Sequence, residues 1–263
     1  MMNNNESSVF KINSGEEFRK LNLEGWEKNN EYWIDSTKTH IDDIEGAFLE
    51  LFESIIENNN QRPLKVFDFG CGDGWIYEKI AENISDEIQY TGFDYFEGFI
   101  DFLKKKYSSD QKSAFYKHDL QKKLPDRFDK EANLIIDAFS FFEMPDMEEG
   151  FKNVGNCLKM GGIFMLITID PIMQLLSVSS DMSQFRSNLK KYEQHGSNLA
   201  YRKTMDVRGA KDQRKYHGIL YSLSDYLEIA QKNSLEVFEF REVKKLDRKQ
   251  PQIYQFILFK KKY

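Results

Sequence analysis

The sequence has little cysteine, little proline and no long apolar run. Its two cysteines, Cys71 and Cys157, lack the paired spacing of a metal site and are too few for a disulfide framework. We therefore expect no bound metal and a reducing compartment. No stretch of about 18 apolar residues occurs, which predicts no membrane span. Residues 1–6 contain neither a basic segment nor an apolar one. We therefore expect no signal peptide and a cytoplasmic location.

Positive charge is also in the minority. The chain has 43 acidic residues against 37 Lys and Arg, a net charge of −6, which argues against a nucleic acid as the main partner. What the sequence does have is apolar content, 40 % of its 263 residues, enough for a sizeable core. Such a length suits one α/β domain with room for an insertion.

One glycine-rich stretch organises the chain. An apolar, strand-like run over residues 66–69 ends in Gly70, Gly72 and Gly74, and a helical pattern begins at Trp75. A strand, a glycine turn and a helix start, in that order, are typical of a nucleotide-binding element. A dinucleotide fingerprint would need its third glycine at position 75, where Trp75 stands. We therefore predict that NAD-type cofactors do not bind.

A second strand is expected over residues 88–93, and it ends in an acid. Asp94 lies 20 residues after Gly74, where a carboxylate can accept hydrogen bonds from both hydroxyls of a ribose. The ring of the next residue, Tyr95, could lie against an adenine. Together with the glycine turn, these residues predict an adenosine-containing ligand.

The pattern Asp68-x-Gly70-x-Gly72-x-Gly74 resembles motif I of the class I S-adenosylmethionine (SAM)-dependent methyltransferases. The resemblance covers about residues 45–263. It implies an α/β fold, a Rossmann-like doubly wound sheet of seven strands in the order 3-2-1-4-5-7-6 with strand seven antiparallel. It also implies SAM as cofactor, held by Asp68, Gly70, Cys71, Gly72, Gly74, Asp94, Tyr95, Asp119, Leu120, Asp137, Ala138 and Phe139.

Two of these groups follow later strands. In the family, an acid and a backbone amide at the positions of Asp119 and Leu120 contact the adenine. The stretch from Asp137 to Glu143 resembles motif IV, which lies beside the methionine part of SAM. It lacks the Asp/Asn-Pro-Pro-Tyr sequence of enzymes that methylate amino groups of nucleobases or glutamine, which argues against those substrates.

We expect two covering segments around the methyltransferase domain of residues 46–263. Residues 1–45 are expected to form a helical N-terminal lid, with residues 1–13 frayed. Residues 172–217 are read as a lid insertion, helical over 172–189, with nine basic residues against four acidic ones, a charge of +5. Such long connections are often functional. The side chains expected to bind the methyl acceptor are Trp26, Tyr32, Trp33, Phe142 and Arg186.

For catalysis, His217 is the first candidate general base, because an imidazole can take a proton at neutral pH. Tyr221 and Asp170 are the alternatives. The pair Asp137 and Asp170 is similar to the acids of metal-dependent catechol-type enzymes, but Pro171 stands where a third oxygen ligand is expected, so no metal is predicted.

The sequence thus predicts a SAM-dependent methyltransferase that acts on an O, N or C nucleophile of a small, anionic metabolite. Arginine suits carboxylate and phosphate oxygens, which is why the basic insertion favours an anionic acceptor. Two alternatives stay open: a non-catalytic SAM-fold binding or scaffold subunit, and an aminopropyl transferase. The intact glycine motif disfavours the first and the basic insertion the second. Neither a nucleic acid nor a membrane is an expected partner.

Overall fold

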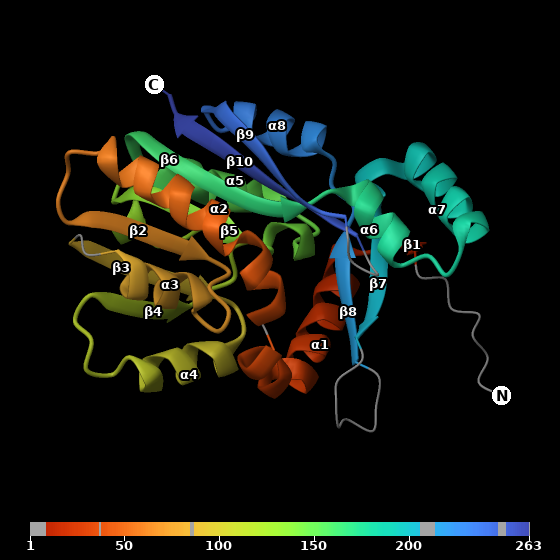
Figure 1. The fold of residues 1–263 in the computed structure, drawn as a ribbon, viewed down its shortest axis with the longest axis horizontal. Helices are drawn as coiled ribbons and strands as arrows, with labels where there is room; N and C mark the ends of the chain where they lie inside the picture. Colours follow the sequence, from red (N-terminus) through yellow and green to blue (C-terminus); the bar gives the residue numbers. More distant parts are fainter. Residues whose placement is uncertain (1–8, 37, 85–86, 206–213, 247–250, 263) are drawn as a thin grey trace.

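The computed structural model describes residues 9–36, 38–84, 87–205, 214–246 and 251–262. Its main element is a seven-stranded sheet in the order β4-β3-β2-β5-β6-β10-β9 (Figure 1). The strands are β2 (Leu64–Phe69), β3 (Ile88–Asp94), β4 (Ser113–Lys117), β5 (Ala132–Ala138), β6 (Leu158–Ile169), β9 (Leu235–Lys245) and β10 (Gln252–Lys261). The first five are parallel, and β10 is antiparallel to both neighbours. This is the expected order 3-2-1-4-5-7-6, so the predicted fold is confirmed.

Helices cover both faces of this sheet. On one face, α2 (Lys38–Glu57), α3 (Trp75–Asn83) and α4 (Glu97–Lys106) pack with β2 and β3 around buried side chains such as Phe48 and Val66. On the other face, α5 (Met147–Cys157) and α8 (Leu223–Lys232) enclose residues such as Phe151 and Phe67. Each such fully buried side chain stabilises the fold by about 1.5–3 kcal/mol. The central strands are buried on both sides, which explains their continuous apolar runs.

The strand β6 starts directly after α5. α5 stops at Cys157 and β6 begins at Leu158. The register then jumps from Ala132 opposite Leu158 to Leu134 opposite Ile163. Gly161 has a left-handed conformation (φ 74°) inside this irregular strand start. The glycine allows the backbone to bulge at the point where α5 passes into β6 without a connecting loop.

A second, three-stranded sheet was not predicted. It pairs β1 (Val9–Lys11), β7 (Leu199–Met205) and β8 (Arg214–Ile219) in the antiparallel order β1-β7-β8. Residues 9–11 were expected to be frayed, and that prediction is wrong, because they pair with residues 199–201 of β7 and Val9 is buried. Three residues are too few for a recognisable strand period.

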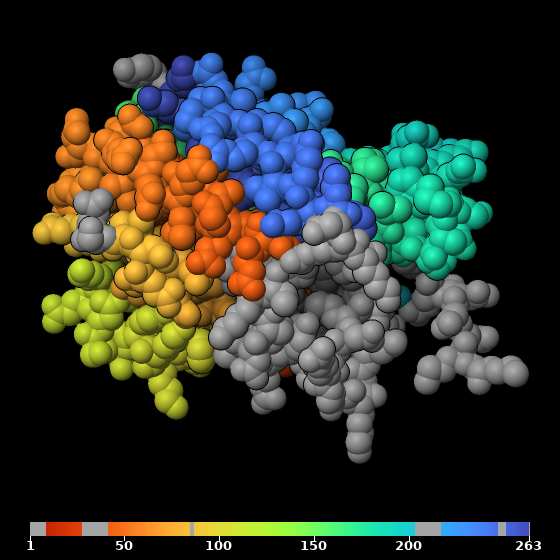
Figure 2. Space-filling model, viewed as in Figure 1, coloured from red at the N-terminus to blue at the C-terminus, as the bar shows by residue number. Residues whose placement is uncertain are grey.

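The described part of the 172–217 segment therefore contains both helices and strands. Its helices are α6 (Pro171–Ser177) and α7 (Met182–His195), followed by a 3-10 turn, η3 (Gly196–Asn198), and the β7–β8 hairpin. Figure 2 shows α7, in teal, projecting beside the body of the molecule. A small third core that includes Leu175, Leu199 and Tyr201 holds this part together.

The N-terminal helix α1 (Gly15–Ser36) lies beside β8 (Figure 1). The next helix, α2, begins at Lys38, so the expected domain boundary at residue 45 falls inside a helix that packs on the sheet. The division into a lid of residues 1–45 and a domain of residues 46–263 stays a prediction. Among the described residues, no helix is both long and apolar enough to cross a membrane.

Candidate functional site

The glycine turn follows β2 and is fixed to the end of β3. Backbone N–H groups of Gly70 and Cys71 both donate to the Phe93 carbonyl, at 2.8 and 3.0 Å. All three glycines have positive φ, at 77°, 51° and 82° for Gly70, Gly72 and Gly74. Residues other than glycine rarely adopt such φ angles, so the turn requires these three glycines.

The three glycines differ in what surrounds them. A Cβ on Gly70 would lie 2.2 Å from the Ser140 Cβ, and one on Gly74 would lie 2.5 Å from Leu103 Cδ2. A Cβ on Gly72 would meet nothing within 4 Å. Gly70 and Gly74 are therefore required by packing inside the protein. Gly72 leaves open space beside the backbone, where a ligand can approach.

Asp94 joins the glycine turn to the start of α4. Its two carboxylate oxygens accept hydrogen bonds from the backbone N–H groups of Gly72 (3.0 Å) and Phe96 (2.8 Å). Burial raises the pKa of this carboxyl to about 6, against the opposing effect of the backbone donors. Each oxygen keeps a second lone pair, so the carboxylate can still accept from a ligand hydroxyl. The neighbouring Tyr95 is half-buried.

Asp68 lies in β2, just before the turn, and is 1 % exposed. The Tyr90 hydroxyl donates to Oδ2, while Oδ1 has no hydrogen-bond partner. Burial, together with the nearby Asp137 and Asp94 carboxylates, raises the pKa of Asp68 to about 8, against the opposing effect of the Tyr90 hydrogen bond. A buried acid without a cation costs stability and is typical of a functional site. Cys71 is buried, so its thiol pKa is raised and it acts as a small packing residue.

Asp68 therefore makes stability fall with rising pH. The folded-state pKa of about 8 exceeds the ordinary value of 3.8, so the folded chain holds one more proton than the unfolded chain between these values. In that range Asp68 lowers the unfolding free energy by about 1.4 kcal/mol per pH unit. We expect Asp68→Asn to remove that share of the slope in urea unfolding at pH 6, 7 and 8. An unchanged slope would show that Asp68 is ionised in the folded protein.

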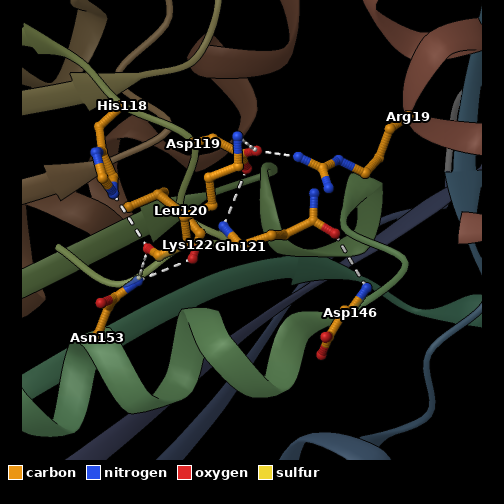
Figure 3. A network of polar contacts seen from close by, with 8 residues as sticks. All are labelled: Arg19, His118, Asp119, Leu120, Gln121, Lys122, Asp146 and Asn153. Atoms are coloured by element: carbon orange, nitrogen blue, oxygen red, sulfur yellow. Dashed lines mark hydrogen bonds and ion pairs between the residues drawn. The ribbon is translucent and has the colours of Figure 1, made fainter. Parts of the chain in front are cut away.

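The loop after β4 carries Asp119 in a network of polar contacts (Figure 3). Asp119 forms an ion pair with Arg19 of α1 and accepts from the Gln121 backbone N–H at 3.1 Å. Asn153 of α5 donates to the carbonyls of Leu120 (2.9 Å) and Lys122 (2.8 Å). The loop is thus fixed from one side by α5, and α1 docks on it from the other. Sequence reasoning did not identify Arg19.

The loop after β5 is fixed by Asp137. Its fully buried carboxylate accepts from the Ser140 hydroxyl and from the backbone N–H groups of Ser140 (3.4 Å) and Phe141 (3.3 Å). Burial raises the pKa of Asp137 to about 7. Phe139, next in the chain after Ala138, has a positive φ of 68°, a strained conformation for this side chain. The Ser140 hydroxyl also reaches the Phe69 carbonyl at 3.2 Å, so this loop and the glycine turn adjoin.

The same loop continues into η2 (Phe141–Glu143), where α1 makes a second contact. Trp26 Nε1 donates to Glu143 Oε2 at 2.8 Å, and Asn22 Nδ2 donates to the Glu143 carbonyl at 3.3 Å. The Trp26 ring also lies edge-on to Phe99 of α4, with 5.7 Å between centroids. The helix α1 therefore covers the carboxyl edge of the sheet. Trp26 was named from the sequence; Glu143 and Asn22 were not.

The three candidate bases take different places. His217 is buried on β8 and accepts at Nε2 from Arg202 Nε, at 3.2 Å, so a proton arriving there would displace this bond. Tyr221 donates its hydroxyl to the Met144 carbonyl at 2.7 Å, just after η2. Asp170 caps α6, where it accepts from the Met173 N–H at 2.9 Å. All three therefore have structural contacts, and their catalytic role stays a prediction.

The expected acceptor-binding residues are spread more widely. Phe142 belongs to η2 and is buried in the core, and Arg186 is exposed on α7. Tyr32 and Trp33 belong to α1, but their side chains are not among those that the structure describes. Among the described residues, no group of three His, Cys, Asp or Glu side chains could hold a metal ion.

Residues 67–164 match the family model of a methyltransferase domain. No curated protein matches. A SAM-dependent methyltransferase structure from Clostridium acetobutylicum aligns with a TM-score of 0.60 at 16 % identity, over 90 % of this chain and 99 % of that chain. One from Methanosarcina mazei gives 0.59 at 15 % identity, over 79 % and 97 %. The 4+2 cyclase SpnF gives 0.53 at 13 % identity, over 81 % and 80 %. At these identities the structural matches establish the fold.

Proposed function

Taking as premise that residues 67–164 form a methyltransferase domain of the class I, SAM-dependent family, we propose that the protein is an enzyme that methylates a small molecule. SAM is its cofactor. The acceptor atom is an oxygen, nitrogen or carbon nucleophile of a metabolite. The observation that carries the proposal is the open space beside Gly72, faced by the doubly anchored carboxylate of Asp94.

The described residues fit SAM in three places. Gly72 lets the ligand approach the backbone, and Asp94 is fixed to accept from ribose hydroxyls. Asp119 can accept from the adenine amino group, in competition with Arg19. The Asp137 loop, which adjoins the glycine turn, would bind the methionine part. When bound, SAM supplies a methyl group on a sulfonium, which is already activated for transfer.

The protein's own contribution is therefore positioning. Holding two reactants in line can supply about 7–11 kcal/mol of the barrier reduction by itself. The glycine turn and Asp94 would fix the cofactor. The helix α1, held over the carboxyl edge by Arg19 and Trp26, would exclude water and enclose the acceptor. A base is needed only for an acceptor that starts protonated, and His217 and Tyr221 are the candidates near η2.

For the acceptor we propose an anionic metabolite, supported by the +5 charge of residues 172–217. Arg202 of this basic set donates to His217 on β8, the strand that lies beside α1. Several other basic residues of the segment, from Lys203 to Lys215, have side chains outside the described ones.

Aminopropyl transfer is the second candidate, because the acids Asp94 and Asp137 adjoin the glycine turn. Such acids would suit a polyamine better than an anion. The two reactions leave different products. Methyl transfer releases S-adenosylhomocysteine (SAH), whereas aminopropyl transfer from decarboxylated SAM releases methylthioadenosine. An acceptor screen that quantifies both products separates these reactions, and a scaffold subunit would release neither.

The cofactor assignment has a direct test. We expect calorimetry to show SAM and SAH binding in the micromolar range, and no NAD binding, because Trp75 replaces the glycine that a dinucleotide site requires. Absence of SAM and SAH binding, or saturable NAD binding that competes with SAM, would end the proposal.

A further inference from the structure

Asn153, a polar side chain on the buried face of α5, organises the loop after β4 (Figure 3). It is 1 % exposed. Its Nδ2 donates to the Leu120 and Lys122 carbonyls, at 2.9 and 2.8 Å, and its Oδ1 accepts from the Leu124 N–H at 2.8 Å. Burying an amide is costly unless its polar atoms are paired. Here all three hydrogen bonds go to the backbone of one loop, so this side chain determines the path of residues 120–124.

The same loop starts beside the carboxylate that faces the open space at Gly72. The His118 N–H donates to the Asp94 carbonyl at 2.8 Å, and the Asp94 carboxylate accepts from the Gly72 N–H at 3.0 Å. Asp119 is the next residue after His118. A ligand held at Asp94 therefore has residues 119–120 as its neighbours along this edge of the sheet.

Asp119 and Leu120 place a hydrogen-bond acceptor next to a donor. The Asp119 carboxylate is bonded to Arg19 and to the Gln121 N–H, and each of its oxygens keeps a second lone pair. The Leu120 carbonyl is held by Asn153, whereas no hydrogen bond among the described residues uses the Leu120 N–H. An acceptor next to a donor is complementary to the amino group and the N1 atom of adenine. Hypoxanthine reverses both groups, because it has a carbonyl oxygen and an N1–H there.

We propose that Asn153 is a positioning residue that gives the cofactor site its selectivity for adenine. This inference rests on the proposed function. Because the Leu120 carbonyl is held on the side of α5, the Leu120 backbone cannot rotate freely, and its N–H keeps one direction beside the Asp119 carboxylate. Without Asn153 the loop loses its three bonds to α5, and the acceptor and the donor no longer share a fixed edge.

The experiment is calorimetry with SAH and with S-inosylhomocysteine, in which hypoxanthine replaces adenine. The wild type should bind SAH at least about 30-fold more tightly, because hypoxanthine reverses both hydrogen bonds to the base. Asn153→Ala should weaken SAH binding about tenfold and change S-inosylhomocysteine binding less than about threefold. The ratio of the two affinities is the measured quantity, because a general loss of stability would weaken both ligands alike.

Three further variants accompany Asn153→Ala. Asn156→Ala changes an exposed asparagine of the same helix and should keep the wild-type ratio. Val154→Ala removes buried methyl groups next to Asn153 and should lower the unfolding temperature without changing the ratio, since valine offers the loop no hydrogen bond. Asn153→Asp keeps the size of the side chain and the acceptor for Leu124 but removes the Nδ2 donor. It should lower the ratio too, and it replaces Asn153→Ala in the test if that variant does not fold.

Three results would overturn the inference and leave the proposed function intact. They are a wild-type ratio below about threefold, an unchanged ratio in the folded Asn153 variants, and an equal fall of the ratio in Val154→Ala. Failure of both ligands to bind to the wild type would instead overturn the proposed function and this inference with it.

Discussion

Gly72→Val should reduce SAM binding by at least about 100-fold and leave the protein folded. The added side chain would enter the open space beside the turn, where nothing lies within 4 Å, and would occupy the place of the ligand. The φ of 51° adds strain of roughly 1–2 kcal/mol, well below the stability of a typical domain. The measurement is calorimetry with SAM, combined with thermal unfolding.

Gly161→Val is the matched control for this variant. Gly161 also has positive φ, at 74°, and a Cβ there would meet only the Lys260 side chain, at 3.9 Å. It lies at the opposite, N-terminal end of β6. Both variants should lose similar stability, but only Gly72→Val should lose SAM. If both bind SAM as the wild type does, the space beside Gly72 is not a ligand site.

The sequence predicted the main sheet because its signals are local. Continuous apolar runs such as β5 identify buried parallel strands, and the glycine turn marks the first strand end. The antiparallel position of β10 came from the resemblance to a family, since residues 252–259 alone carry no sign of direction. The cofactor-binding candidates followed, because in such sheets they sit at strand ends that the pattern locates.

The residues that α1 brings to the site could not be predicted in the same way. Arg19 meets Asp119 across 100 positions of the chain, and Trp26 meets Glu143 across 117. No periodicity encodes such pairs, because each depends on how a helix outside the sheet docks. The same holds for β1, whose three residues become a strand only through pairing with β7. Glu143 had one usable signal, an acid directly after the apolar pair that ends the β5 loop.

Asp94→Ala should have the other large effect on the cofactor. The carboxylate serves two purposes: it holds the turn through Gly72 and α4 through Phe96, and it is expected to accept from the ribose hydroxyls. Losing two charge-assisted hydrogen bonds to the ligand costs about 2–4 kcal/mol, or roughly 30- to 1000-fold in affinity. SAH is the better probe here. It lacks the positive sulfonium, so neighbouring carboxylates contribute less to its binding than to the binding of SAM.

The pH dependence of SAH binding adds a second, independent signature of Asp94. Its pKa of about 6 means that the carboxylate is ionised at neutral pH and protonated in more acidic solution. Because the ligand hydroxyls need the ionised form, affinity should be full above pH 6 and should fall as the pH drops through that value. Asp94→Asn should bind weakly but with little change between pH 7 and 5, whereas Asp101→Asn, on the exposed side of α4, should follow the wild type. If the wild-type affinity stays constant down to pH 5 and Asp94→Ala binds SAH as the wild type does, Asp94 does not bind the ribose. A carboxylate that accepts from the ribose hydroxyls has to lose affinity when it is protonated or removed.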